Sequence, residues 1–165
     1  MDVPPFFKRY ELKETLGYGS YGTVKRAISH IDGIDYAVKI IITQPYDCIQ
    51  EDILRELSFL RNHNHPNIIQ YKEMFHHNDM GYTYIYIVME LCDTPLWKYL
   101  TNHKLSIEQK TTFGDEVLDG LLAISKYGYY HGDLSINNIM IKNNHIKLID
   151  FGFSGRVYAS IYQLP

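Results

Sequence analysis

The sequence has little cysteine, no long apolar run and no cluster of basic residues. Only two cysteines occur, Cys48 and Cys92, too few for a disulfide framework, which favours a reducing compartment. No apolar stretch approaches the roughly 20 residues that a membrane-spanning helix needs. Because Lys and Arg are nowhere concentrated, a nucleic-acid platform and a polybasic membrane anchor are both disfavoured. These absences predict an intracellular protein, cytoplasmic or nuclear, with no membrane or nucleic-acid partner.

What the sequence does contain is the composition of an ordinary globular core. Hydrophobic residues make up 45% of the 165 residues, charged residues make up 21%, and the formal net charge is -3. A disordered chain would carry fewer apolar residues and more charge. Residues 1–5 lack the basic and then apolar pattern of a secretion signal. The length predicts one domain or two small lobes.

The first half of the chain predicts a sheet accompanied by one helix. Short runs of alternating or β-branched apolar residues indicate strands over residues 10–16, 22–28, 34–42, 68–75 and 82–91. Between the third and fourth of these runs, Ile53, Leu57 and Leu60 recur at helical spacing, so residues 49–61 predict an amphipathic helix. Pro66 ends this helical region because proline disfavours helical geometry in the residue before it.

The second half of the chain predicts a long helix and a hairpin. Ser106 followed by Gln109 is a capping-box signature, which predicts the start of a helix, and Gly128 is a candidate C-cap at its end. A wide apolar stripe between them suggests burial on more than one side, and its members are Phe113, Val117, Leu118, Leu121, Leu122 and Ile124. Residues 139–142 and 145–148 flank two asparagines, which tolerate positive φ and predict a tight hairpin.

A glycine-rich turn separates the first two predicted strands. Residues 17–24 read GYGSYGTV. Glycines let the backbone fold over a phosphate chain and bring amide N–H groups close to it. The G-x-G-x-x-G pattern alone is a weak signal, because it occurs in plain turns and in dinucleotide-binding folds. A strand follows this turn, whereas a dinucleotide-binding fold would continue into a helix, so the dinucleotide interpretation is disfavoured.

Two charged residues stand at positions that suggest a pair. Lys39 lies in a predicted strand among Val and Ile residues, and a lysine directed inward from such surroundings needs an anionic partner. Glu56, on the predicted helix that follows, could supply that partner while the lysine holds phosphates. Taken singly, the lysine would be read as a solvated strand residue and the glutamate as a surface charge.

The densest group of polar residues lies near the end of the chain. Residues 131–138 read HGDLSINN, and residues 148–152 read LIDFG. Asp133 and Asn138 share one loop, and Asp150 follows the predicted hairpin. Two carboxylates and an amide near a phosphate-binding turn suit Mg²⁺, a hard cation that prefers oxygen ligands and substrate phosphates. Each residue alone has a plain interpretation as a loop residue, but all of them in this order are hard to obtain by chance.

From residue 10 to residue 152 the sequence resembles the eukaryotic protein kinase family, in its Ser/Thr-kinase style. The turn GYGSYGTV resembles the family's glycine-rich loop, and YAVK resembles the strand that carries its ATP-anchoring lysine. HPNII and YIVMEL resemble the segment after the αC helix and the fifth strand running into the hinge. HGDLSINN resembles the catalytic loop, and DFG matches in full. The resemblance implies an α+β, two-lobe fold with a β-rich first lobe, one αC helix and a helical second lobe.

The resemblance also assigns roles, which are expectations at this stage. Asp133 would accept the proton of the substrate hydroxyl, with Lys39 and Glu56 completing the catalytic set. The metal ligands for Mg²⁺ would be Asn138 and Asp150. ATP would be held by the glycine-rich turn, the walls around adenine and the hinge, that is, by Leu16, Gly17, Gly19, Gly22, Val24, Ala37, Lys39, Glu90 and Cys92. The implied activity is transfer of the ATP γ-phosphate to Ser or Thr hydroxyls of a protein substrate.

Two residues depart from the family's catalytic-loop pattern. Gly132 stands where the family has an arginine that receives the activation-loop phosphate, so activation by phosphorylation through that residue is unavailable. Ser135 stands where Ser/Thr kinases carry a lysine that neutralises the transferred phosphoryl group, so its absence should cost rate. The tip of the glycine-rich turn, Ser20 and Tyr21, is a candidate inhibitory phosphorylation site, although the interpretation of Tyr21 as a plain aromatic at a loop tip is favoured over it.

A third departure concerns extent. The resemblance implies a catalytic domain over residues 10–165, with a first lobe over 10–91 and an incomplete second lobe over 92–165. No Ala-Pro-Glu motif follows DFG, so the expectation is either a piece of a longer kinase or a short relative completed by a partner chain. A short chain of this kind would phosphorylate protein substrates poorly.

Other functions compete with the kinase interpretation. Close histidine pairs invite a zinc site, but no cysteine or carboxylate lies at ligand spacing beside them. The tyrosines at 82, 84 and 86 could stack on bases, although such alternation on a strand is more often cross-strand packing. The main competitor is a kinase-like ATP-binding module, or pseudokinase, that regulates a partner without transferring phosphate.

Overall fold

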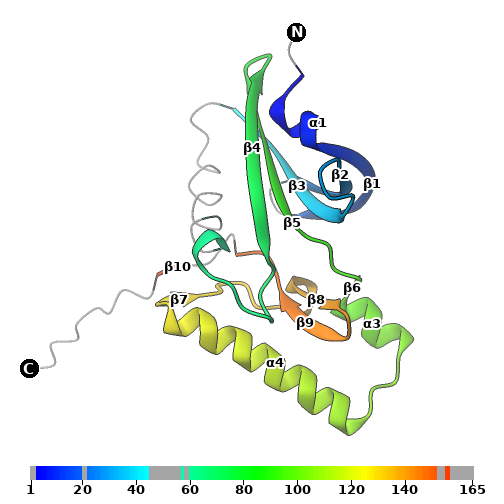
Figure 1. Ribbon diagram of the computed structural model, residues 1–165. Helices are drawn as coiled ribbons and strands as arrows, with labels where there is room; N and C mark the ends of the chain where they lie inside the picture. The colour runs from blue at the N-terminus through cyan, green and yellow to red at the C-terminus, as the bar shows by residue number, and fades with distance from the viewer. Residues whose placement is uncertain (1–2, 20–21, 45–56, 58–59, 152–154, 157–165) are drawn as a thin grey trace, which may run out of the picture. The chain divides into compact units, whose positions relative to one another are not determined.

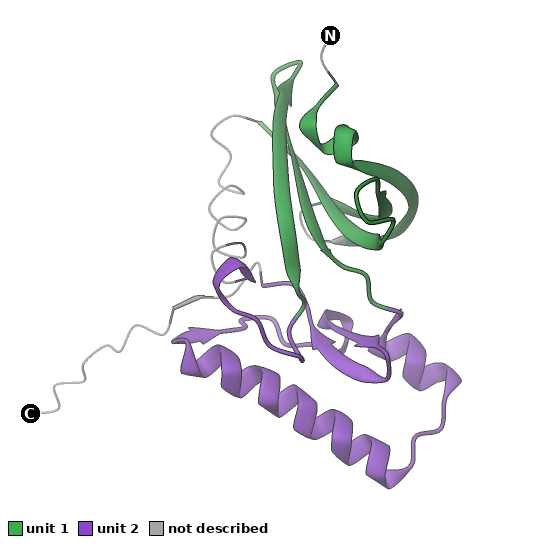
Figure 2. Ribbon diagram, in the orientation of Figure 1, with its two compact units in different colours: residues 1–53, 69–92 green, residues 54–68, 93–165 purple. Residues whose placement is uncertain are grey.

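A computed structural model describes residues 3–19, 22–44, 57, 60–151 and 155–156 of the chain. The chain divides into two compact units (Figure 2), one of residues 1–53 with 69–92 and the other of residues 54–68 with 93–165. None of the helices in the part that the structure describes is long and apolar enough to span a membrane.

The first unit is built on a five-stranded antiparallel sheet with the strand order β1-β2-β3-β5-β4 (Figure 1). Its strands are β1 (Tyr10–Gly19), β2 (Gly22–Ser29), β3 (Asp35–Thr43), β4 (Tyr71–Asp79) and β5 (Tyr82–Glu90). All five predicted strands are confirmed, and β4 is the one displaced furthest along the chain. It begins three residues later than predicted, because Ile68 belongs to the second unit and forms a parallel bridge with Leu148 there.

A short helix before the sheet was not predicted. This helix, α1 (Pro5–Arg9), carries proline at its start, where the fixed φ of proline suits a helix. Five residues are too few for a helix to persist in water on local hydrogen bonds alone, so tertiary contacts must hold it. Phe6 supplies them, since its side chain is fully buried in the hydrophobic cluster of this unit. The other buried members of the cluster are Tyr10, Ala27, Tyr36, Val38, Tyr86 and Val88.

Most of the helix predicted over residues 49–61 lies outside the described residues. The structure describes Leu57 and residues 60–62 of this region and its continuation, and all of them are helical. Leu57 and Leu60 are both buried, as expected for the apolar face of an amphipathic helix.

The second unit also contains the helices α3 (Leu96–Asn102) and α4 (Ile107–Lys126), and two small sheets. The first sheet has the order β6-β8-β9, and the second pairs β10 with β7. Their strands are β6 (Thr94–Pro95), β7 (Tyr129–Tyr130), β8 (Ile139–Lys142), β9 (His145–Leu148) and β10 (Gly155–Arg156). The predicted hairpin is confirmed as β8–β9, and Asn143 and Asn144 have φ values of 51° and 64° at its turn.

The predicted ends of α4 are confirmed in detail. The Ser106 hydroxyl accepts a hydrogen bond from the Gln109 amide, and the Gln109 side chain accepts one from the Ser106 amide. Gly128 follows the helix with a φ of 74°. The expected burial on more than one side is not met, because Leu118 and Leu122 are 57% and 55% exposed. Phe113 and Ile124 are buried on the face toward β7 and β9, the strands that α4 contacts most, whereas the two leucines are more than half exposed.

Candidate functional site

The glycine-rich turn is the tip of the β1–β2 hairpin. Gly17 pairs with Val24 and Gly19 pairs with Gly22 across the two strands. An added Cβ at Gly22 would lie 2.1 Å from the Ile40 carbonyl oxygen, whereas an added Cβ at Gly17 would meet nothing within 4 Å. Gly22 is therefore required by the close approach of β2 to β3. Ser20 and Tyr21, the candidate phosphorylation site, lie outside the described residues.

Lys39 lies on β3 with its side chain almost fully buried, at 4% exposure. Its direct neighbours across the sheet are Val24 on β2 and Ile87 on β5, so the three side chains share one face. Ala37 lies two residues before Lys39 and projects from the same face. The expected lining residues of the first unit are thus brought to one side of one sheet. Glu56, the expected partner of Lys39, is outside the described residues.

The segment after β5 is anchored by Glu90. Its amide donates to the Gln70 carbonyl at 2.9 Å, and its carboxylate accepts from the Gln70 amide at 2.9 Å. This pair of bonds fixes the chain where the resemblance expects the hinge. Cys92 is half-buried two residues further on, and Leu16, the expected cover of the adenine, is exposed at the end of β1. Gln70 had no predicted role.

In the second unit, Asn138 is bonded directly to Asp133. The Asn138 Nδ2 donates to Asp133 Oδ2 at 2.8 Å and to the Asp133 carbonyl at 2.9 Å. The turn η1 (Ile136–Asn138) brings the two together, with the Asn138 amide donating to the Ser135 carbonyl. This double contact closes the loop on itself and fixes the carboxylate of Asp133, which is otherwise exposed.

The residue pair before Phe151 is joined to the same loop. The Ile149 amide donates to the Asn138 carbonyl at 3.0 Å, which places the start of the IDF segment beside Asn138. Asp150 follows with a φ of 61°, a left-handed conformation that few non-glycine residues adopt. Such a conformation persists only where neighbouring contacts hold it, so the backbone at Asp150 is fixed by its surroundings.

His131 connects both segments and had no role in the sequence-based prediction. It is buried, and its Nδ1 accepts a hydrogen bond from the Asp133 amide. The other ring nitrogen, Nε2, therefore carries the proton and donates to the Ile149 carbonyl at 3.0 Å. The ring also contacts Phe151, with the ring centroids 4.8 Å apart. In the sequence, the signal of this bridging role is a histidine at the start of a polar motif.

Comparison with known proteins agrees with this geometry. The family described as "Protein kinase domain" matches residues 10–163. The chain belongs to the protein kinase family. Among curated proteins it is 32% identical over 161 residues to the probable serine/threonine-protein kinase fhkE of Dictyostelium discoideum, covering 90% of this chain and 22% of that protein.

Two further relatives of this protein kinase come from animals. The chain is 36% identical over 153 residues to NUAK family SNF1-like kinase 1 of Homo sapiens, covering 88% of this chain and 22% of that protein. It is 34% identical over 152 residues to the cyclin-dependent kinase 4 homolog of Caenorhabditis elegans, covering 87% of this chain and 37% of that protein. The chain thus spans between about a fifth and somewhat over a third of the length of these relatives.

The protein kinase family implies ATP and a divalent metal ion, and the residues present fit that ion. The Nδ2 of Asn138 donates to Asp133, which leaves the Oδ1 as the amide atom able to face a cation. With the carboxylate of Asp150, this gives a set of hard oxygen donors, the kind that Mg²⁺ prefers. Among the described residues, no three His, Cys, Asp or Glu side chains gather around a common metal position, so the structure offers no candidate zinc site in that part.

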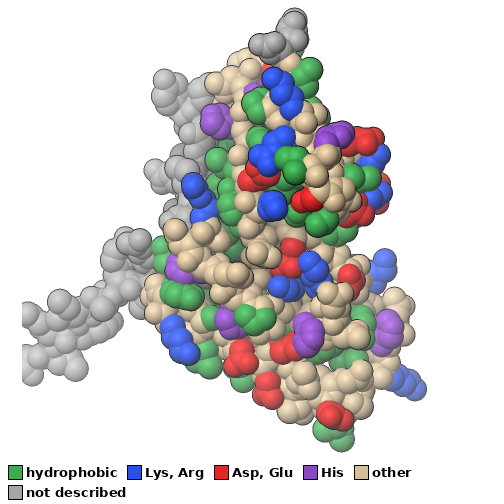
Figure 3. All heavy atoms as spheres, in the orientation of Figure 1, with side chains coloured by type: hydrophobic (Ala, Val, Ile, Leu, Met, Phe, Trp, Pro, Cys, Tyr) green, Lys and Arg blue, Asp and Glu red, His purple; other side chains and the backbone are tan. Residues whose placement is uncertain are grey.

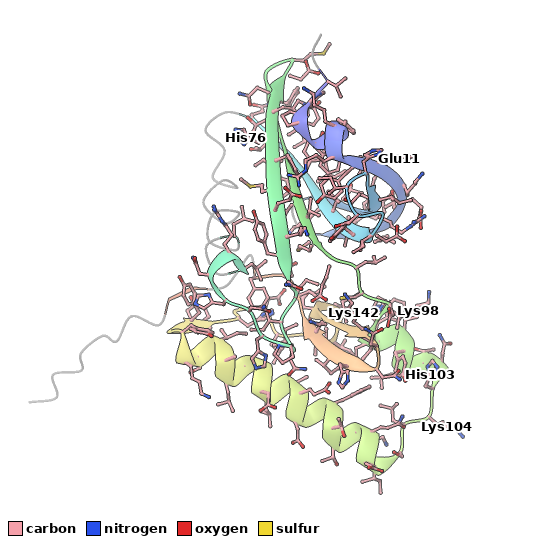
Figure 4. The ribbon with its side chains drawn as sticks, viewed as in Figure 1. Glu11, His76, Lys98, His103, Lys104 and Lys142 are labelled. Atoms are coloured by element: carbon pink, nitrogen blue, oxygen red, sulfur yellow. The ribbon has the colours of Figure 1, made fainter. Side chains whose placement is uncertain are left out.

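The surface of the kinase shows charges of both signs. Figure 3 shows Lys and Arg side chains interspersed with Asp and Glu on the face it displays. In the second unit, Lys98 and Lys104 project outward from α3 and the segment after it (Figure 4). No broad basic surface of the kind that binds nucleic acid is visible on that face.

Proposed function

We propose that this protein kinase transfers the γ-phosphate of ATP to Ser or Thr hydroxyls of protein substrates, with Mg²⁺ as its metal ion. The observation that carries the proposal is the hydrogen-bonded loop in which Asn138 holds Asp133 and Ile149 at once. Ser/Thr specificity is supported by the printed name of the Dictyostelium relative. An intracellular location, where ATP is plentiful, accompanies this proposal.

Asp133 is the proposed acceptor of the substrate proton. Its Oδ2 is occupied by Asn138, so Oδ1 is the oxygen that can accept from a substrate hydroxyl. As that proton moves to Asp133, the hydroxyl oxygen bonds to the γ-phosphorus, and the bond from that phosphorus to the β,γ-bridging oxygen breaks to release ADP. The fixed orientation of the carboxylate is the main contribution of the protein to this step, because positioning is a large part of the barrier reduction in such reactions.

The remaining proposed contacts neutralise charge on the phosphates. Lys39 projects among apolar residues on β3 and is the proposed phosphate contact of the first unit. The amides of the glycine-rich turn are proposed to lie over the phosphates. A bound Mg²⁺, held by Asn138 and Asp150, would neutralise the charge that develops on the phosphoryl oxygens.

Binding of a fluorescent ATP analogue, titrated with and without Mg²⁺, tests the nucleotide part of the proposal. We expect Mg²⁺-dependent binding that Lys39→Met weakens by about tenfold or more, because a charge-assisted contact is lost while the buried volume is kept. The matched control is Lys25→Met. Lys25 pairs with Val38 in the sheet and so projects from the opposite face, and its replacement should leave the affinity unchanged.

Phosphate transfer to a generic protein substrate, measured for the same preparation, separates the two candidate functions. A kinase should lose about a hundredfold or more of its kcat in Asp133→Asn while keeping its affinity for the analogue. Binding with no transfer at all, as opposed to the slow transfer expected of a short chain, would instead identify a kinase-like ATP-binding module. The proposal would be refuted if the wild-type chain bound the analogue neither with Mg²⁺ nor without it.

A further inference from the structure

The helix α1 lies outside the part of the chain that matches the protein kinase domain. The match begins at Tyr10, and α1 ends at Arg9. Phe6 is nevertheless among the most buried side chains of the first unit, with no exposed area. A segment that precedes the family domain is therefore part of the core of its sheet.

Phe6 is seated in a column of nearly parallel rings. Its ring stacks on Tyr86 with a centroid distance of 4.3 Å and an angle of 11° between the ring planes. The Phe6 ring also stacks on Tyr10, with the ring centroids 5.4 Å apart. His77 continues the column beyond Tyr86, at 5.7 Å from Tyr86 and 4.9 Å from Tyr84. Stacked aromatic pairs contribute beyond the area that they bury, so this seat is specific for a planar ring.

A polar latch holds the end of α1 to β4. The Arg9 guanidinium and the Tyr10 hydroxyl each donate to the Glu73 carboxylate at 2.5 Å, to Oε2 and Oε1 respectively. The Arg9 guanidinium also lies over the Phe75 ring. Both carboxylate oxygens of Glu73 on β4 thus accept hydrogen bonds from the two residues at which α1 ends and β1 begins.

The seat of Phe6 is on the opposite face of the sheet from Lys39. On β3 the residues alternate, so Tyr36 and Val38 belong to the Phe6 cluster while Ala37 and Lys39 project from the other face. On β5, Tyr86 and Val88 belong to the cluster while Ile87 and Met89 project from the other face. Figure 4 shows His76 projecting from β4 on the side away from α1, which illustrates the same alternation. Phe6 therefore packs against one face of the strands β3 and β5, and the proposed nucleotide contacts lie on the opposite face of the same strands.

We propose that α1 acts as a positioning cap for the nucleotide site. Phe6, seated on the face of the sheet opposite Lys39, fixes the positions of β3 and β5. The strands in turn hold Lys39, Ala37 and the segment after Glu90 where nucleotide binds. The inference rests on the proposed function, since it concerns the regulation of that same site. Because binding couplings are reciprocal, nucleotide must strengthen the docking of α1 by the factor with which α1 strengthens nucleotide binding.

Analogue affinity, measured for each variant at a temperature well below its own unfolding midpoint, is the first test. We expect Phe6→Ala to weaken the affinity by about tenfold and Phe6→Leu, which keeps apolar volume in the seat, by clearly less. Phe7→Ala is the matched control on the same helix, because Phe7 is 40% exposed and its ring meets Phe6 and Tyr86, among the described residues, edge to face. Its affinity should stay within about twofold of wild type.

A second control removes loss of stability as an explanation. Ser106→Ala would remove the acceptor of the Gln109 amide at the start of α4 in the second unit, and it should lower the unfolding midpoint without touching α1. The two variants are compared under conditions that lower their unfolding midpoints equally. If this control then weakens nucleotide binding as much as Phe6→Ala does, Phe6 acts through stability alone and the inference fails. An unchanged affinity in Phe6→Ala also overturns it, while leaving the proposed function intact.

Hydrogen exchange keeps the inference testable even if the nucleotide proposal fails. In the absence of nucleotide, Phe6→Ala and Phe6→Leu should speed exchange at the amides of Val38, Lys39 and Ile87, and Phe7→Ala should not. With nucleotide, exchange at the α1 amides of the wild type should slow. Unchanged exchange on β3 and β5 in both Phe6 variants would refute the cap, whatever the chain binds. If Phe6→Ala fails to fold, Phe6→Leu serves as the test variant in both the affinity measurement and the hydrogen-exchange measurement.

Discussion

Gly22 and Gly17 stand in the same turn but under different constraints. β2 passes so close to β3 at Gly22 that a single added carbon would overlap the Ile40 carbonyl, whereas Gly17 faces open space. Neither position has a positive φ in the described backbone. The two glycines therefore differ in the space available for a Cβ atom and not in backbone conformation. The pair allows the steric contribution of one glycine to be measured against a neighbour in the same motif.

We expect Gly22→Ala to lower the free energy of unfolding by about 1–3 kcal/mol, because the backbone must move to admit the methyl group. Urea unfolding followed by circular dichroism measures this change. Gly17→Ala should stay within about 0.5 kcal/mol of the wild type, as for a substitution with no special mechanism. Equal effects in the two variants would show that the approach of β2 to β3 does not constrain Gly22.

Helix α4 shows how local sequence signals fix the ends of an element. Ser106 and Gln109 exchange hydrogen bonds at its N-terminus, and Gly128 takes up the left-handed conformation just after its C-terminus. These signals act within a few residues of each other, and this is why they could be predicted from sequence. By contrast, α1 and α3 have no such periodic signal, since each is shorter than about two turns.

Ser106→Ala should destabilise the chain by about 1 kcal/mol, because the Gln109 amide loses its acceptor and the capping box is broken. The urea midpoint of unfolding measures the loss. Thr112→Ala is the control, since the exposed Thr112 hydroxyl donates back to the Glu108 carbonyl within the helix. That variant should be neutral or slightly stabilising because alanine is the better helix former. Loss of stability in both would indicate a general effect of the substitution.

At the scale of the whole molecule, stability at alkaline pH depends in part on Tyr10. Burial, and then the hydrogen bond to Glu73, raise the pKa of the Tyr10 hydroxyl well above its ordinary value of 10.0. The unfolded chain therefore ionises at this residue before the folded chain does. The stability that Tyr10 contributes is complete below pH 10 and is lost as the pH rises from there toward the folded pKa.

The advantage of the wild type over Tyr10→Phe should be constant from pH 7 to 9 and then shrink by up to about 1.4 kcal/mol per pH unit above pH 10. Urea unfolding of both proteins at pH 8 and at pH 11 measures the difference. Comparing the two proteins cancels the titration of the other tyrosines and of the lysines. A difference that stays the same at both pH values would show that Tyr10 titrates normally in the folded chain.

Much of the fold could be predicted because the strands and α4 carry their own patterns. The alternation along residues 82–87 and the asparagine pair of the β8–β9 hairpin are local, and the structure confirms both elements. Membership of the protein kinase family followed from the order of several motifs. What could not be predicted depends on contacts between distant residues: the seating of Phe6 on Tyr86, the Gln70–Glu90 pair and the bridging role of His131. No window of sequence contains both partners of any of these contacts.

The buried ring of Phe6 also bears on where this domain is taken to start in practice. Tyr10, where the family match begins, is the natural choice for the first residue of a recombinant fragment. Such a cut would remove Phe6 and Arg9, uncover the ring of Tyr86 and leave Glu73 without its cation. An open apolar seat of this kind invites association between molecules. A preparation intended for crystallisation, or for screening of inhibitors, should therefore begin before Pro4 so that the seat stays filled.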